Sequence, residues 1–270
     1  AVTTKGVANV PWPGNPTPRV CETYGGMLNA IGLQNPGIDV FIERDIPYLK
    51  QYDTNIIVNV CGKTPDEYID VVRRLAEEDV ALLEINISCP NVKAGGIAFG
   101  QDPKQVEKIT AQIKAVAKQP VIMKLSPNVT DITEMAKAAE AGGADAISLI
   151  NTLTGMKIDI NRRTFALANK TGGMSGPAVK PVAVRMVYQA AHAVNIPVLG
   201  IVENYSYLEC PDCGRKISVF GESHIDEVAE ELGVPVIGKM PIDASLAEAV
   251  ENENFAEVSN DYLAEAVNKL

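Results

Sequence analysis

The stretch Val80-Ala81-Leu82-Leu83-Glu84-Ile85-Asn86-Ile87-Ser88-Cys89-Pro90-Asn91 decides the fold class. Its first half is an apolar run typical of a buried strand, and Pro90 with Asn91 then stops the strand. Cys89 thus sits at a strand end between two amides and a hydroxyl. A cysteine there is an acid/base-capable group among neutral side chains that both donate and accept hydrogen bonds. The alternative interpretation, a small buried cysteine beside a turn, is disfavoured by the surroundings described below.

Similar apolar runs recur along the chain and alternate with amphipathic helices. The strand candidates are Val2–Val7, Asn55–Val60, Ala81–Ile87, Pro120–Leu125, Ala146–Asn151, Pro197–Val202 and Val234–Ile237. Helix starts carry capping signals at Thr64, Asp102 and Asp131, and later helices are expected over Pro177–Val194 and Asp226–Leu232. Buried strands that alternate with helices predict a parallel α/β sheet covered on its faces. The number of units favours a (β/α) barrel, one strand short of a TIM barrel, or a long doubly wound sheet.

Polar side chains gather just after the predicted strands. They are Lys5, Cys61, Asn86 to Asn91, Lys124 with Ser126, and Asn151 with Thr152. In a parallel barrel these strand ends converge on one face, where active sites lie. Their common register along the chain therefore predicts one polar site at that face.

Composition narrows the class of protein. The chain has 270 residues, of which 46% are hydrophobic, so it can bury a core. Its formal net charge of −10 argues against nucleic acid or an anionic membrane as a partner. We expect no membrane span and no signal peptide, and the odd count of five cysteines fits a reducing cytoplasm. The first residue is Ala1, so we expect a processed, trimmed or engineered N-terminus.

Seven collinear stretches then point to one family. They are Gly14–Arg19, Gly26–Gly37, Asn86–Asn91, Gly95–Gly100, Lys124–Asn128, Ile150–Leu153 and Thr171–Pro177. From residue 1 to about 198 the chain resembles dihydroorotate dehydrogenase, specifically the NAD-linked, two-subunit form of its soluble class.

The resemblance implies a TIM barrel that holds FMN at the carboxyl ends of its strands and oxidises dihydroorotate to orotate. It implies that Cys89 is the base that removes the C5 proton, while the C6 hydride passes to the flavin. Lys5 would lie between flavin and substrate, and Lys124 near the flavin N1/O2 edge. Substrate contacts are implied for Asn29, Asn86, Asn91, Asn151 and Thr152. Further flavin contacts are implied for Asn86, Ile150, Ser175, Gly176 and Gly200.

Simpler roles exist for several of these residues. Lys5 and Lys124 taken alone could be solvated charges at strand ends. The glycines between Thr171 and Pro177 could form a flexible loop, and Asn29 could be a turn residue. The dense collinearity of the motifs favours the functional interpretation.

The resemblance breaks at both ends. The first barrel strand of the family and the glycine turns that hold the FMN phosphate are missing, so flavin affinity is expected to fall. From about residue 196 the chain resembles Mrp-type, ParA/MinD-related P-loop ATPases that carry iron–sulfur clusters. The matching residues are Gly200–Asn204, Cys210–Cys213, Phe220–Glu222, Ala229–Pro235 and Gly238–Asp243. We therefore expect a chimera in which residues 1–198 form a barrel portion and residues 199–270 complete the same domain. The barrel would either close with seven strands or keep two unpaired edges.

The ATPase-like segment lacks the phosphate-binding loop Gly-x-x-x-x-Gly-Lys-Ser/Thr, so we expect no ATP hydrolysis. What it keeps is Cys210 and Cys213, which we place in a small hairpin between 205–209 and 216–220. The resemblance implies an iron–sulfur cluster or zinc shared across a dimer interface, since one chain supplies two of the four usual ligands. An unoccupied knuckle or a redox-active pair are the alternatives.

Three functions follow from the sequence. The leading hypothesis is an FMN-dependent dihydroorotate dehydrogenase, working as a homodimer with an iron–sulfur and FAD electron-transfer subunit. The second is an inactive chimeric barrel scaffold. The third is a metal or iron–sulfur carrier that uses Cys210 and Cys213.

Overall fold

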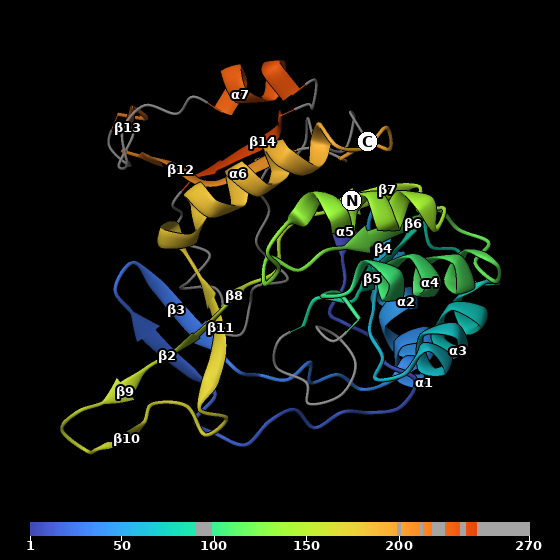
Figure 1. Cartoon of the computed structure of the whole chain (residues 1–270), viewed down its shortest axis with the longest axis horizontal. Helices are drawn as coiled ribbons and strands as arrows, with labels where there is room; N and C mark the ends of the chain where they lie inside the picture. The colour runs from blue at the N-terminus through green and yellow to red at the C-terminus, as the bar shows by residue number, and fades with distance from the viewer. Residues whose placement is uncertain (90–98, 199–200, 211–212, 218–224, 233–235, 242–270) are drawn as a thin grey trace. The chain divides into compact units, whose positions relative to one another are not determined.

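The computed structural model describes residues 1–89, 99–198, 201–210, 213–217, 225–232 and 236–241 (Figure 1). Asn91 and Gly200, both predicted site residues, lie outside this part of the chain. The chain divides into two compact units, Val2–Val198 and Leu199–Leu270 with Ala1. Whether the second unit completes the domain begun by the first stays a prediction.

A five-stranded parallel sheet organises the larger unit. Its strands, in spatial order, are β1 (Val2–Thr3), β4 (Ile56–Val60), β5 (Leu82–Asn86), β6 (Val121–Lys124) and β7 (Ala146–Ser148). Every neighbouring pair is parallel, and Val198 adds an isolated bridge beside Ile147 of β7. The predicted mixed α/β fold with a parallel sheet is confirmed. Because β1 and β7 are the outer strands of this sheet in the described residues, its closure into a barrel stays a prediction.

The helices that follow the strands begin where the sequence predicts. They are α3 (Pro65–Leu75), α4 (Pro103–Lys114) and α5 (Ile132–Ala141), joined later by η3 (Pro177–Val179) and α6 (Lys180–Ala191). The caps Thr64, Asp102 and Asp131 each accept a hydrogen bond from a main-chain N–H in the first helical turn. Such a cap is worth about 1 kcal/mol. The helix predicted over Pro177–Val194 is shorter than expected, because it begins as a 3₁₀ turn and ends at Ala191.

The core lies between these helices and the parallel sheet. Tyr68 and Leu75 of α3 and Ile113 of α4 are fully buried against Leu83 and Ile85 of β5 in one hydrophobic cluster. Full burial of each large apolar side chain contributes about 1.5–3 kcal/mol. A second group of helical turns, α1 (Ile38–Val40), the π-helical η1 (Phe41–Asp45) and α2 (Ile46–Leu49), adds Ile38, Phe41 and Ile46 to this cluster. The cluster holds the strands rigidly, so their carboxyl ends can position polar groups.

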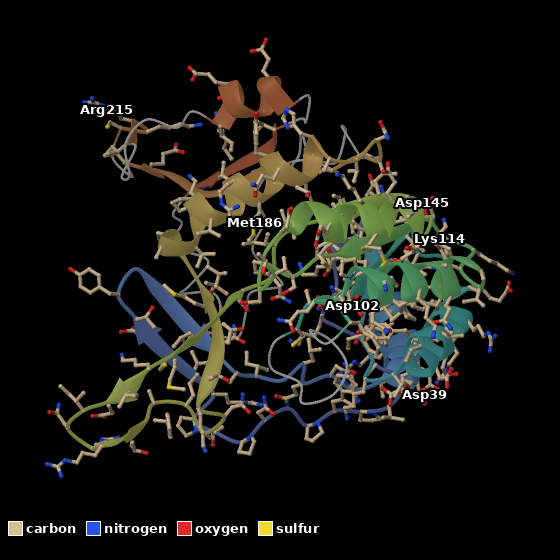
Figure 2. All side chains as sticks on the ribbon, viewed as in Figure 1. Asp39, Asp102, Lys114, Asp145, Met186 and Arg215 are labelled. Atoms are coloured by element: carbon tan, nitrogen blue, oxygen red, sulfur yellow. The ribbon has the colours of Figure 1, made fainter. Side chains whose placement is uncertain are left out.

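An ion pair joins helix α4 to the start of β7. Figure 2 shows Lys114 beside Asp145, and their Nζ and Oδ2 atoms are 2.6 Å apart. The same carboxylate oxygen accepts the main-chain N–H of Val121 at 2.6 Å. Burial raises the pKa of Asp145, but the hydrogen bonds from Lys114 and Val121 outweigh it, so the pKa lies below its ordinary value.

A separate antiparallel sheet is the main feature that the periodicity did not predict. Its strands, in spatial order, are β2 (Val20–Thr23), β3 (Gly26–Asn29), β11 (Thr171–Ser175) and β8 (Leu153–Met156). The short hairpin of β9 (Ile158–Asp159) and β10 (Thr164–Phe165) extends beyond it (Figure 1). The glycine-rich stretch after Thr171 is therefore a strand, and the alternative of a flexible loop is wrong for Thr171–Ser175.

Gly173 explains why this strand is rich in glycine. It pairs with Asn29 of β3, and a Cβ atom at this position would overlap the side chain of Thr152. The missing side chain therefore lets Asn29 and Thr152, both predicted substrate contacts, approach the same place.

The second unit contains a three-stranded sheet in the order β13 (Lys216–Ile217), β12 (Ile201–Glu209) and β14 (Val236–Pro241), together with helix α7 (Ile225–Leu232). The strand predicted over Pro197–Val202 is wrong in its bounds, because Val198 bridges β7 while β12 begins at Ile201. The predicted cysteine hairpin is confirmed, since β12 and β13 pair antiparallel on either side of it. No helix in the described part of either unit is long and apolar enough to cross a membrane.

Candidate active site

The carboxyl edge of the parallel sheet carries the candidate site. Strand β5 ends at Asn86 and β6 at Lys124, and these two residues are direct partners in the parallel register. In the same register Lys124 is the partner of Ser148, the last residue of β7. Parallel strands aligned in this way bring their terminal side chains to one edge.

A cavity of about 140 Å³ opens in the larger unit among residues from distant parts of the sequence. It is lined by Lys5, Asn29, Ile31, Gly32, Leu33, Asn86, Cys89, Lys124, Asn151 and Thr152. The structure thus brings together both predicted lysines, the predicted cysteine and all the predicted substrate contacts that are described. The cavity is smaller than the roughly 300–1,000 Å³ of drug-sized ligand pockets, so it suits a small polar molecule.

Three predicted flavin contacts do not line this cavity. Ile150 packs against the hydrophobic core next to Asn151. Ser175 ends β11 opposite Met27, and Gly176 follows it in close contact with the backbone of β3. Their roles in binding FMN stay predictions.

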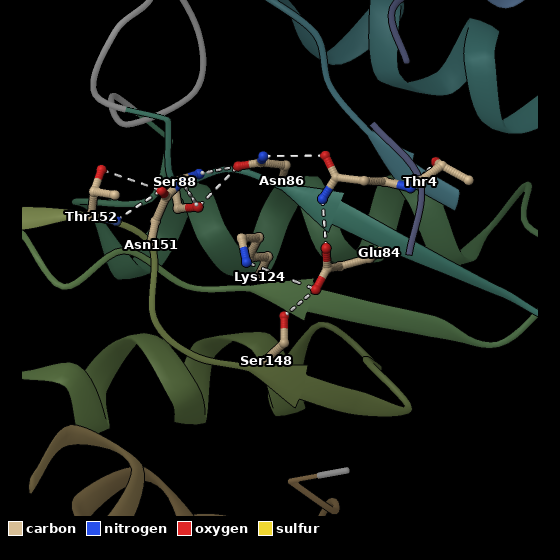
Figure 3. A network of polar contacts seen from close by, with 9 residues as sticks. Thr4, Glu84, Asn86, Ser88, Lys124, Ser148, Asn151 and Thr152 are labelled. Carbon is tan, nitrogen blue, oxygen red and sulfur yellow. Dashed lines mark hydrogen bonds and ion pairs between the residues drawn. The ribbon is translucent and has the colours of Figure 1, made fainter. Parts of the chain in front are cut away.

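A buried carboxylate lies behind the cavity, and the sequence-based prediction missed it. Glu84 of β5 is 8% exposed, and its Oε1 is 4.0 Å from the Nζ of Lys124 (Figure 3). Asn59 Nδ2 donates to Oε2 at 2.5 Å, and Ser148 Oγ donates to Oε1 at 2.8 Å. The signal was present in the sequence, because a glutamate inside an apolar strand is costly to bury without a partner.

The amides at the cavity form a continuous network, also drawn in Figure 3. Asn86 Oδ1 accepts two hydrogen bonds from Ser88, one from its hydroxyl at 2.9 Å and one from its main-chain N–H at 3.3 Å. Asn151 Nδ2 donates to Ser88 Oγ at 2.8 Å, and the N–H of Thr152 donates to Asn151 Oδ1 at 2.8 Å. Side chains held from several sides in this way are preorganised for a ligand.

Two buried groups support the cavity without lining it. The hydroxyl of Tyr68 donates to the main-chain carbonyl of Asn86 at 2.8 Å, and burial raises the Tyr68 pKa, so this donor stays protonated. Burial, followed by the neighbouring Cys89, raises the pKa of the Cys61 thiol to about 12. Cys61 is therefore an inert core residue, whereas Cys89 lines the cavity.

The arrangement can bind an anion rich in hydrogen-bond acceptors. Two lysines supply positive charge, amides supply N–H groups, and a cysteine can take a proton when it is in its thiolate form. Among the described residues, no cluster of three or more His, Cys, Asp or Glu side chains could hold a metal ion.

The two cysteines predicted as metal ligands lie at the hairpin of the second unit. The N–H of Cys210 donates to the carbonyl of Arg215 at 3.0 Å, and the N–H of Gly214 donates back to the carbonyl of Cys210 at 2.9 Å. Cys213 is exposed between them, and neither cysteine forms a disulfide. Their role as metal ligands stays a prediction.

Comparison with known proteins decides the family. The family model for dihydroorotate dehydrogenase matches residues 1–202, about three quarters of the chain. The chain belongs to this family, a family of oxidoreductases. The catalytic subunit of dihydroorotate dehydrogenase B (NAD(+)) from Lachnoclostridium phytofermentans is 76% identical over 201 residues, which cover 74% of this chain and 67% of that protein. The subunit of the same name from Alkaliphilus metalliredigens is 66% identical over 201 residues, which again cover 74% of this chain and 67% of that protein. The chain thus spans about two thirds of these relatives.

A second family model, for the NUBPL iron-transfer P-loop NTPase, matches residues 177–270. The two matches overlap near the predicted junction, so the two-part description of this dihydroorotate dehydrogenase family member is confirmed. A solved nucleotide-binding protein from Archaeoglobus fulgidus in complex with ADP is 19% identical and covers 83% of this chain and 84% of its own. The TM-score of that comparison is 0.33.

Proposed function

We propose that the chain oxidises dihydroorotate to orotate, a step of pyrimidine biosynthesis, in the cavity at the carboxyl edge of its parallel sheet. The observation that carries the proposal is that Cys89 and Lys124, far apart in the sequence, line one small cavity together with the described asparagines Asn29, Asn86 and Asn151. Family membership supports the reaction class.

Different residues would bind the substrate and remove its proton in this reaction. Asn86 and Asn151 would donate hydrogen bonds to the carbonyl and carboxylate oxygens of the substrate, and Lys5 would add positive charge. Cys89, as its thiolate, would take the C5 proton at Sγ, so that a C5–C6 double bond forms as hydride leaves C6. A positioned base of this kind typically contributes a factor of about 10²–10⁴ in rate.

The donor set at the strand ends fits the polar edge of a flavin ring. Asn86 and Lys124 are adjacent on neighbouring strands, so an amide and an ammonium point from one edge of the sheet. FMN, when bound, supplies the acceptor for the hydride. Lys124 would hold positive charge near the N1/O2 edge of the flavin, where negative charge develops on reduction. A fixed charge of this kind lowers the barrier to hydride transfer most in a preorganised site.

The test is anaerobic mixing of the FMN-loaded full chain with dihydroorotate, followed by absorbance at the flavin band. We expect bleaching in the wild type and about 10²–10⁴-fold slower bleaching in Cys89→Ala. Cys61→Ala is the matched control, because it removes a nearby buried thiol that does not line the cavity. Bound FMN that dihydroorotate never bleaches would refute the proposal and favour the inactive scaffold.

A second proposed function is metal binding by Cys210 and Cys213 in a dimer, as an iron–sulfur cluster or zinc. Support comes from the tight turn between β12 and β13, which presents both cysteines at one hairpin end. Metal analysis of the wild type and of the double variant Cys210→Ser, Cys213→Ser tests it. Equal metal content in the two samples would end this proposal.

The relatives' name, catalytic subunit, supports a further proposal that an electron-transfer subunit is a partner.

A further inference from the structure

Glu84 starts a chain of hydrogen bonds with a single direction. A carboxylate can only accept, so the 2.5 Å contact requires the Nδ2 of Asn59 to face Glu84. The Oδ1 of Asn59 then faces the opposite way, where it accepts the Nδ2 of Asn86 at 3.3 Å. The amide orientation of Asn86 is thereby set by a charge two contacts away.

The same donor-to-acceptor order continues through the residues at the cavity, from Asn86 through Ser88 to Asn151. With its Nδ2 toward Asn59, Asn86 presents Oδ1 to Ser88 and accepts the Ser88 hydroxyl at 2.9 Å. Ser88 Oγ is then an acceptor for the Nδ2 of Asn151 at 2.8 Å. The Oδ1 of Asn151 accepts the main-chain N–H of Thr152 at 2.8 Å.

The groups that can only donate or only accept a hydrogen bond are all consistent with this direction. The carboxylate of Glu84 can only accept, and the main-chain N–H groups of Ser88 and Thr152 can only donate, to Asn86 Oδ1 and Asn151 Oδ1. Every donor in the chain points toward Glu84, and no link is opposed (Figure 3).

The direction has a chemical consequence for the ligand. The oxygens of Asn86 and Asn151 each accept two hydrogen bonds from the protein. Each NH₂ group carries a second N–H beyond the one used in the chain. Toward the cavity these amides are therefore donors, which suits carboxylate and carbonyl oxygens and disfavours N–H groups.

We propose that Glu84 is a positioning residue that sets ligand specificity, by fixing through Asn59 the donor orientation of Asn86 and Asn151. This inference rests on the proposed function for the identity of the ligand, an anionic pyrimidine. Ser148 bonds the other oxygen of Glu84 and lies off the chain, so it provides the matched control.

The test compares orotate with its carboxamide, orotamide, by calorimetric titration of the full chain. Asn59→Ala interrupts this series of hydrogen bonds and leaves the Glu84 and Lys124 side chains in place. We expect it to lower the preference for orotate over orotamide about five- to tenfold, the worth of one ordinary hydrogen bond. Ser148→Ala should leave the preference unchanged. An Asn59→Ala variant that keeps the wild-type preference, or loses both ligands equally, would overturn the inference while the proposed function stands.

A second readout decides the inference without the ligand. In ¹⁵N-labelled full chain, the side-chain NH₂ of Asn86 should exchange with solvent slowly in the wild type and in Ser148→Ala, and at least fivefold faster in Asn59→Ala. Equal exchange in all three proteins overturns the inference. If the wild type binds neither orotate nor orotamide, the proposed function fails, and this exchange measurement alone decides the role of Glu84.

Discussion

Replacing Lys124 with Met removes the ammonium at the cavity and keeps most of the apolar stem. In the native chain this ammonium is 4.0 Å from the Glu84 carboxylate. Two unit charges at that distance attract by about 4 kcal/mol at an effective dielectric constant near 20. The Lys124 side chain is 23% exposed, so water screens part of this attraction. Glu84 also keeps its hydrogen bonds from Asn59 and Ser148. We therefore expect Lys124→Met to lower the free energy of unfolding by about 1–2 kcal/mol.

The assay is urea unfolding of the full chain at pH 7, followed by circular dichroism, alongside titration with orotate. Lys124→Arg is the matched control because it keeps the charge. We expect Lys124→Met to weaken the binding of anionic orotate, because the cavity loses one of its two positive charges, and Lys124→Arg to weaken it less. A Met variant with wild-type stability and wild-type affinity for orotate would refute the placement of this charge between Glu84 and the cavity.

Three further predictions concern residues around the site and the core. Gly173→Ala places a methyl group against Thr152, so we expect a loss of about 1–3 kcal/mol in urea unfolding together with weaker orotate binding; unchanged values would contradict the packing. Burial raises the pKa of Asp145, but hydrogen bonds including that from Lys114 bring it below the ordinary value, so the carboxylate stabilises the fold above its unfolded pKa of about 3.9. Asp145→Asn should therefore be less stable than the wild type at pH 7, with the gap closing as the pH falls through the lowered folded-state pKa of Asp145, and a gap independent of pH would count against it. Cys61, with its pKa raised to about 12 by burial, should resist alkylation by iodoacetamide at pH 8 until urea is added. Alkylated Cys61 detected by mass spectrometry in the native protein would contradict this prediction.

The parallel sheet was predictable because its strands are continuous apolar runs between capped helices. Thr64, Asp102 and Asp131 mark helix starts by short-range chemistry, and all three act as caps in the structure. The polar strand ends could be placed together for the same reason, since parallel strands align their carboxyl ends. Asn86 and Lys124 are adjacent on that ground alone.

The antiparallel sheet could not be predicted from periodicity. Its strands β3 and β11 pair across more than 140 residues of chain, and β11 is rich in glycine, which is normally depleted in strands. Glycine is required at position 173 because Thr152 occupies the space of a side chain. That requirement depends on a long-range contact, which a local pattern does not record.

The role of Glu84 was missed for a different reason. Its spacing fits a strand, and the surrounding apolar residues hide a single charge in the pattern. Only the register of β4, β5 and β7 brings Asn59 and Ser148 to its two oxygens. A lone charge inside a predicted buried strand is therefore a useful signal for a polar network beneath a site.

The proposed function requires that Cys89 face a cavity that binds an anionic pyrimidine. The direct measurement is the rate at which iodoacetamide alkylates Cys89 in the native full chain, with and without orotate, resolved by mass spectrometry. Cys213, exposed at the hairpin of the second unit, is the internal control. We predict that saturating orotate slows alkylation of Cys89 at least tenfold and leaves Cys213 unchanged. Alkylation of Cys89 at the same rate with and without orotate would contradict the placement of Cys89 in the ligand-binding cavity.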